Sequence, residues 1–149
     1  MSKIKYFNEN ILVKKKSIIL RLDFNVPIQN NLIQDSTRID LAIPLIKELI
    51  EKKSKVIILS HLGRPNGTVD KSFSLKPVYN YLRNKLGSKI HFLNFKDNSE
   101  FKDKISKIDY GNIILLENIR FFKEETEDDK TFAKKLSALG NIYINDAFS

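Results

Sequence analysis

The chain has 149 residues, 42% of them hydrophobic and 30% charged, a composition that favours one globular domain and excludes a disordered chain. It contains no cysteine and only two histidines, which excludes disulfides, thiol nucleophiles and cysteine-based metal sites and disfavours a zinc site. The net charge of +8 is compatible with nucleic acid, a membrane surface or a small acidic ligand as a partner.

The apolar runs are too short for a membrane helix, which needs about eighteen residues, and the amino terminus lacks the apolar core of a secretion signal. We therefore expect a cytoplasmic protein that does not bind membranes. Only five of the 26 basic residues are arginines, whose planar guanidinium groups bind carboxylate or phosphate through paired hydrogen bonds. These arginines are Arg21, Arg38, Arg64, Arg83 and Arg120.

Strand and helix patterns alternate along the first half of the chain. β-Branched residues predict a strand over 17–22, which is followed by a turn at 29–31. An apolar stripe predicts a helix from about Thr37, in which Pro44 should kink the helix or restrict its first turns. Residues 55–60 are an almost uninterrupted apolar run, which is typical of a parallel strand buried on both faces.

The alternation continues to the end of the chain. Ser74 is expected to cap a helix that ends at Gly87, and the acidic run 124–129 suits the start of another helix that stops at Gly140. Further strands are expected at 89–93, 112–116 and 141–144, and a weak helical pattern covers 100–106. The pattern predicts an α/β fold: a Rossmann-like parallel sheet of five or more strands with helices on both faces, in a single domain over 1–149.

Polar residues follow the ends of the predicted strands, where ligands bind to open α/β sheets. Three arginines and a histidine there indicate a site for a small, strongly anionic molecule, and the neighbouring aspartate and asparagine would bind its hydroxyl groups. The sequence shows neither a Walker-type phosphate loop nor a spacing that supports a Ser-His-Asp triad. The residues of the predicted site are Asp23, Asn25, Arg38, His61, Arg64 and Arg120.

Five segments resemble the amino-terminal lobe of the phosphoglycerate kinase family in order and spacing. They are RLDFNVP at 21–27, TRI at 37–39, SHLGRP at 60–65, LENIRF at 116–121 and NDAF at 145–148. Members of this family are longer and two-lobed, with the acid substrate on this lobe and the nucleotide on the other. The resemblance implies a carboxyl phosphotransferase of glycolysis, which transfers a phosphoryl group reversibly between 1,3-bisphosphoglycerate and ADP to give 3-phosphoglycerate and ATP.

The resemblance also implies a role for each matching residue. Residues 23–25 would position the glycerate part of the substrate, and residues 61–64 with Arg120 would contact its phosphate end. Arg38 would be catalytic, because it would contact the carboxyl or acyl-phosphate end and stabilise the phosphoryl group in transfer. The substrate-binding residues implied in this way are Asp23, Phe24, Asn25, Arg38, His61, Leu62, Gly63, Arg64 and Arg120.

Magnesium-bound ATP or ADP would bind to the second lobe, so the resemblance implies no nucleotide or metal site in this chain. The family continues beyond the segment that matches residue 149 into that lobe. We therefore expect this chain to be the amino-terminal lobe alone and to be inactive by itself. Its expected partners are 3-phosphoglycerate or 1,3-bisphosphoglycerate and the missing nucleotide-binding lobe.

Other interpretations remain open on the residues alone. The position of Arg21 inside a strand pattern favours a structural ion pair over a substrate contact, and Asp23 could serve only to cap a turn. The chain could be a stand-alone anion-binding module without catalysis. A nucleic-acid binder is disfavoured, because the lysines are scattered and the sequence shows no RNA-binding aromatic motif or helix-turn-helix.

Overall fold

A parallel sheet forms the centre of the molecule. The computed structural model describes residues 7–8 and 11–147, so Phe148 of the last matching segment lies outside the described residues. Within these ranges five strands pair in parallel in the order β5-β6-β4-β1-β7, which confirms the predicted fold class. The strands are β1 (Ser17–Leu22), β4 (Lys55–Leu59), β5 (Ile90–Leu93), β6 (Ile113–Leu116) and β7 (Ile142–Asp146).

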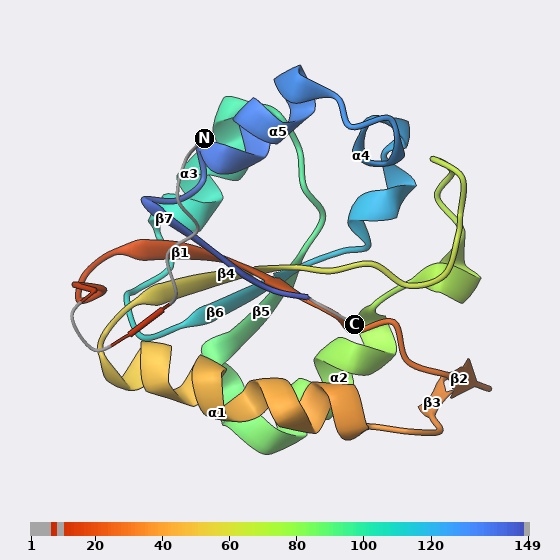
Figure 1. Ribbon diagram of the computed structural model, residues 1–149, viewed down its shortest axis with the longest axis horizontal. Helices are drawn as coiled ribbons and strands as arrows, with labels where there is room; N and C mark the ends of the chain where they lie inside the picture. The colour runs from red at the N-terminus through yellow and green to blue at the C-terminus, as the bar shows by residue number, and fades with distance from the viewer. Residues whose placement is uncertain (1–6, 9–10, 148–149) are drawn as a thin grey trace.

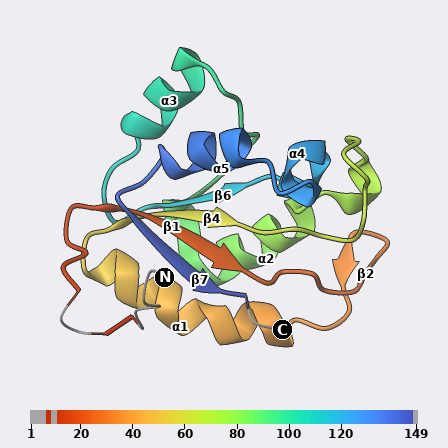
Figure 2. The same cartoon turned by 45° about the horizontal axis from the view of Figure 1, so that its top comes forward.

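Helices cover both faces of this sheet (Figure 1). Figure 2 shows the same layers after a turn about the horizontal axis, with α1 and α2 below the sheet and α3 and α5 above it. Alternate residues of a strand point to opposite faces, so Ile18 packs with the α1 and α2 core and Ile19 with the α3 and α5 core. The helices are α1 (Thr37–Glu51), α2 (Lys76–Leu86), α3 (Ser99–Ser106), α4 (Lys123–Thr126) and α5 (Lys130–Ser137).

Short elements connect these layers. The predicted turn after β1 forms a small antiparallel hairpin, with Asn30 and Asn31 in the left-handed region. Two-residue strands leave no readable period in a sequence, so the hairpin was not predicted. The short elements are β2 (Ile28–Gln29), β3 (Leu32–Ile33) and the 3-10 turns η1 (Lys71–Phe73), η2 (Gly87–Lys89) and η3 (Ile119–Phe121).

Helix α1 runs without interruption through Pro44. The reason is that Pro44 is exposed, while Ile39 in the first half and Ile46 and Leu49 in the second are fully buried against the sheet. Burial of apolar side chains on both sides of the proline holds the helix together in spite of the missing backbone hydrogen bond.

The expected cap of α2 was wrong in detail. The helix begins at Lys76, one residue later than a Ser74 cap requires, but the Ser74 hydroxyl does accept the Lys76 N–H at 3.1 Å while it donates to the carboxylate of Glu117. Glu117 also accepts the backbone N–H of Leu75 at 2.7 Å and so shares the capping role from a distant part of the chain. The acidic run 124–129 covers α4 from its second residue onward, and the last residue of the run, Asp129, caps α5 by accepting the N–H of Phe132 at 2.7 Å.

Candidate functional site

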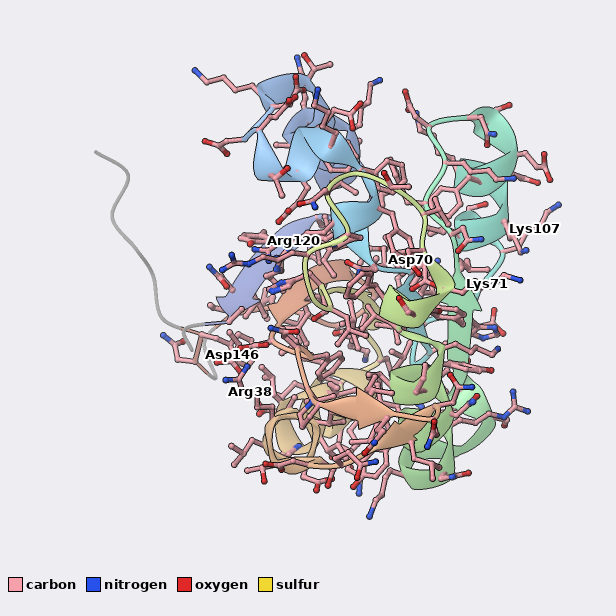
Figure 3. The ribbon with its side chains drawn as sticks, turned by 90° about the vertical axis from the view of Figure 1, so that its right-hand side faces the viewer. Arg38, Asp70, Lys71, Lys107, Arg120 and Asp146 are labelled. Atoms are coloured by element: carbon pink, nitrogen blue, oxygen red, sulfur yellow. The ribbon has the colours of Figure 1, made fainter. Side chains whose placement is uncertain are left out.

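The carboxyl ends of three neighbouring strands bring the predicted site residues to one end of the sheet. Strands β1, β4 and β6 lie side by side and run in parallel, so the loops that follow them leave the sheet at the same edge. Figure 3 looks at this end of the molecule, where Arg38 and Arg120 lie on the face turned toward the viewer. Asp146, at the end of the next strand, lies on the same face and gives the cluster an acidic edge.

The loop after β1 is joined to the start of α1 and to the next loop. The Asn25 N–H donates to Asp23 Oδ1 at 2.9 Å, so Asp23 does cap a turn, while its Oδ2 accepts a hydrogen bond from Arg38 Nη1 at 2.9 Å. The same nitrogen donates to the Asn25 carbonyl at 3.2 Å. The Asn25 side-chain oxygen accepts the Gly63 N–H at 2.9 Å, so these contacts fix Arg38 relative to both loops.

Phe24 contributes packing to the site. Its side chain is fully buried, its N–H donates to Ser60 Oγ at 2.9 Å, and its carbonyl accepts the Val26 N–H at 2.8 Å. Ser60 Oγ in turn donates to the carbonyl of Leu22 at 2.8 Å. The ends of β1 and β4 are therefore tied together through one buried hydroxyl, which leaves the flanking Asp23 and Asn25 as the polar side chains of this segment.

The loop after β4 presents one unpaired cation. Leu62 is buried, and Gly63 adopts a φ of +61°, where an added Cβ would lie 2.4 Å from the Phe73 ring. These two residues shape the loop through packing and backbone conformation. The next residue, Arg64, is exposed, and its side chain has no hydrogen-bond or ion-pair partner among residues 7–8 and 11–147. Its guanidinium group is therefore available to an anionic ligand.

A chain of polar contacts connects the second loop to the third. Arg21 Nη2 lies 3.3 Å from His61 Nδ1 and 3.3 Å from Glu125 Oε1. The other oxygen of Glu125 accepts from Arg120 Nε at 3.2 Å. The predicted structural ion pair of Arg21 is thus confirmed, and its partner is Glu125. Burial, followed by the charges of Arg120 and Arg21, lowers the pKa of His61.

Glu125 and Asn118 are the two site residues that sequence reasoning missed. Nothing in the acidic run distinguishes Glu125 from its neighbours, because only the folded chain shows which carboxylate meets the arginines. Asn118 belongs to a matching segment but received no role. It is fully buried, donates to the carbonyls of Leu62 and Phe73 at 2.8 and 2.9 Å, and accepts the Arg120 N–H at 3.0 Å.

The charges of the cluster suit an anion. Asp23 pairs with Arg38, and Glu125 pairs with two further arginines, while Arg64 is left unpaired within the described part of the chain. A nearby hollow of about 500 Å³ between α5 and the edge of the sheet includes none of the nine predicted substrate residues. Its wall contains Glu124, Asp128 and Asp129, whose carboxylates would repel an anion.

Metal-ligand clusters and membrane-spanning helices are both absent from the described ranges. No group of three or more histidine, aspartate or glutamate side chains is placed there to hold a metal ion. No helix in the same ranges is long and apolar enough to cross a bilayer. The assignment of the magnesium nucleotide to another lobe stays a prediction.

Residues 8–149 match the model of the family described as phosphoglycerate kinase. The chain belongs to the phosphoglycerate kinase family. It is 45% identical over 141 residues to the phosphoglycerate kinase of Wolbachia pipientis wMel, a match that covers 95% of this chain and 35% of that protein. It is 48% identical over 136 residues to the phosphoglycerate kinase of Dictyoglomus turgidum, covering 91% of this chain and 34% of that protein.

Solved structures of the family share the fold. The phosphoglycerate kinase of Coxiella burnetii superposes with a TM-score of 0.81 at 39% identity, over 93% of this chain and 34% of that one. The enzyme of Pyrococcus horikoshii OT3 superposes with a TM-score of 0.80 at 27% identity, over 94% of this chain and 36% of that one. The chain therefore spans about a third of the length of the relatives that it matches.

Proposed function

We propose that this chain is the amino-terminal, acid-substrate lobe of a phosphoglycerate kinase, and that it binds 3-phosphoglycerate or 1,3-bisphosphoglycerate at the cationic end of the sheet. The observation that carries this proposal is the joining of three loops, each with a family segment, by hydrogen bonds from Gly63 to Asn25 and from Asn118 to Leu62. Arg64 and Arg120 belong to these loops, and Arg38 is bonded to the first of them. The complete enzyme would transfer a phosphoryl group reversibly between 1,3-bisphosphoglycerate and ADP. A role in glycolysis implies a cytoplasmic location.

The phosphate end of the substrate is assigned to the second and third loops. Arg64 is exposed and unpaired within residues 7–8 and 11–147, so it can approach a phosphate without first losing a carboxylate. Arg120 keeps Nη1 and Nη2 for a ligand, because its contact with Glu125 uses Nε. Guanidinium groups placed in this way form charge-assisted, bidentate hydrogen bonds with phosphate oxygens.

The reacting end of the substrate is assigned to Arg38. Its contacts with Asp23 and Asn25 both use Nη1, which leaves Nη2 and Nε for the carboxyl or acyl-phosphate oxygens. Phosphoryl transfer depends on alignment and on neutralising charge on the moving group, and Arg38 is anchored well enough to do both. Asp23 and Asn25 lie beside it and can bind the hydroxyl of the glycerate.

The magnesium nucleotide is assigned to the part of the enzyme outside this chain. The sequence has no Walker-type loop, and the described residues provide no cluster of metal ligands. Magnesium bound with the nucleotide would supply positive charge at the transferring phosphate. This lobe alone would therefore bind the acid substrate without turning it over.

An amide-shift NMR titration with 3-phosphoglycerate tests the proposal, with ATP in a parallel sample. We expect shifts concentrated around Asp23, Arg38, His61, Arg64 and Arg120, and weak, scattered shifts with ATP. Shifts that avoid these loops, or none at all, would contradict the assigned site. Equal affinity for inorganic phosphate would favour an anion-binding module with no preference for the glycerate.

Two substitutions sharpen this titration. Arg64→Met removes a charged donor but keeps most of the aliphatic length of the side chain, and it should weaken 3-phosphoglycerate binding about 10- to 100-fold, as expected for a charged hydrogen bond of about 1.5–3 kcal/mol. Arg83→Met is the matched control, because Arg83 lies on α2 and donates to Tyr79. Equal affinities of the two variants would count against a role for Arg64.

A further inference from the structure

The contact between Arg21 and His61 restricts where the histidine carries its proton. Arg21 Nη2 lies 3.3 Å from His61 Nδ1. A guanidinium group has only donors, so Nδ1 must be the acceptor in this contact. A neutral imidazole that accepts at one nitrogen carries its proton on the other. The proton of neutral His61 therefore lies on Nε2.

We propose that Arg21 and Glu125 are positioning residues, which hold His61 as the neutral Nε2–H tautomer and so present a hydrogen-bond donor to the bound anion. The identity of that anion rests on the proposed function. The tautomer itself does not, since it follows from contacts present without any ligand. In the opposite tautomer Nε2 would carry a lone pair and could not donate a hydrogen bond to the anion.

Glu125 is the residue that fixes the direction of the Arg21 donor. The same Nη2 atom of Arg21 lies 3.3 Å from Glu125 Oε1, and the second carboxylate oxygen is held by Arg120. The side chains of Arg21 and Glu125 are only 18% and 17% exposed, so neither can move freely into solvent. A carboxylate held from two sides therefore orients Arg21, and Arg21 orients the imidazole.

The charges around His61 come from four segments. Arg21 lies on β1, Asp23 in the loop after it, Arg120 in η3 and Glu125 on α4. Burial and the two arginines oppose protonation of the ring, while Asp23 and Glu125 favour it. The lowered pKa of His61 agrees with a ring that stays neutral and donates through Nε2.

Long-range ¹H–¹⁵N NMR of the histidine side chains in the ligand-free chain tests the proposal. The chain has only two histidines, so a His91→Gln variant assigns both spectra, and His91 serves as an internal reference. We expect a protonated Nε2 and a hydrogen-bonded, unprotonated Nδ1 at His61, measured at a pH above the ordinary histidine pKa of about 6.5. A protonated Nδ1 in the unmodified chain would overturn the proposal, whether or not any variant folds.

Substitutions separate positioning from a simple charge effect. Arg21→Met should move the ¹⁵N resonance of His61 Nδ1 to the position of a nitrogen that accepts no hydrogen bond. It should also allow the Nδ1–H tautomer to appear and raise the pKa of His61. If Glu125 positions Arg21, Glu125→Gln should shift the Nδ1 resonance of His61 in the same way. If Glu125 acted only through its charge, the substitution would lower the pKa of His61 and leave the Nδ1 resonance unchanged. Arg83→Met should change neither nitrogen. An unaltered Nδ1 resonance in the Arg21 variant would refute the positioning role.

The ligand titration remains a separate test. If the chain binds no 3-phosphoglycerate but His61 shows the expected tautomer and its response to Arg21→Met, the proposed function fails and this inference stands. If 3-phosphoglycerate binds but His61 does not respond to Arg21→Met, the inference fails and the proposed function stands.

Discussion

Asn118 holds two parts of the candidate site together, and its replacement by alanine has a cost that can be worked out from its contacts. The side chain is fully buried and satisfies the carbonyls of Leu62 and Phe73 and the N–H of Arg120. In Asn118→Ala the carbonyl of buried Leu62 loses a partner at about 2 kcal/mol, and the two partly accessible groups lose about 0.5 kcal/mol each. The expected loss of unfolding free energy is therefore about 3 kcal/mol, a large part of the roughly 5–15 kcal/mol of a typical domain.

Urea unfolding followed by far-UV circular dichroism measures this loss. With a slope near 2 kcal/mol per molar urea, the midpoint should fall by about 1.5 M while the slope stays unchanged. Asn80→Ala is the control, because Asn80 is exposed on α2, where alanine should be neutral or stabilise by about 0.5 kcal/mol. Asn118→Asp should be at least as damaging as the alanine variant, since a carboxylate would face two carbonyl oxygens.

A loss below about 1 kcal/mol in Asn118→Ala with an unchanged slope would refute the reasoning, because buried groups left without partners cannot cost so little. The same variant should also bind 3-phosphoglycerate more weakly than the unmodified chain. The loop that carries Arg64 and the turn that carries Arg120 would then have lost their common anchor.

Three further predictions concern the same end of the sheet. Gly63→Ala should destabilise the chain by about 2 kcal/mol or more, and clearly more than Gly87→Ala. Both glycines have positive φ, but only a Cβ at Gly63 would meet a ring, that of Phe73. Equal losses of stability in thermal unfolding would show that the Phe73 contact is unimportant. The pKa of folded His61 lies below its unfolded value of about 6.5, so between these two pKa values the unfolded state binds more protons than the folded state. The free energy of unfolding should therefore fall as the pH drops through this window. Urea midpoints measured across the window should show a flatter dependence in His61→Gln, and an identical slope would contradict the assignment. Binding of 3-phosphoglycerate should weaken as ionic strength rises, because salt screens the arginine cluster, and calorimetric affinities independent of salt would argue against a charge-driven site.

The regular part of the fold could be predicted from local patterns. The uninterrupted apolar runs of β4 and β6 indicate burial on both faces of a parallel sheet, and every residue of these strands is buried. The end of the sheet that carries the site could also be predicted, because polar residues that follow parallel strands must leave at one edge. Asp23, His61 and Arg120 were placed in this way, from positions in the sequence alone.

The pairing of side chains was decided by the tertiary structure. Arg21 meets Glu125 across a separation of 104 residues, and Glu117 reaches the Ser74 hydroxyl 43 residues before it. A local pattern reports propensity and burial, which depend on near neighbours, whereas a hydrogen bond depends on distances that exist only after distant segments have packed. The sequence by itself therefore determined the sheet, its covering helices and the arginines at its carboxyl edge. Which carboxylates hold those arginines in place was decided only by the packing of distant segments in the folded chain.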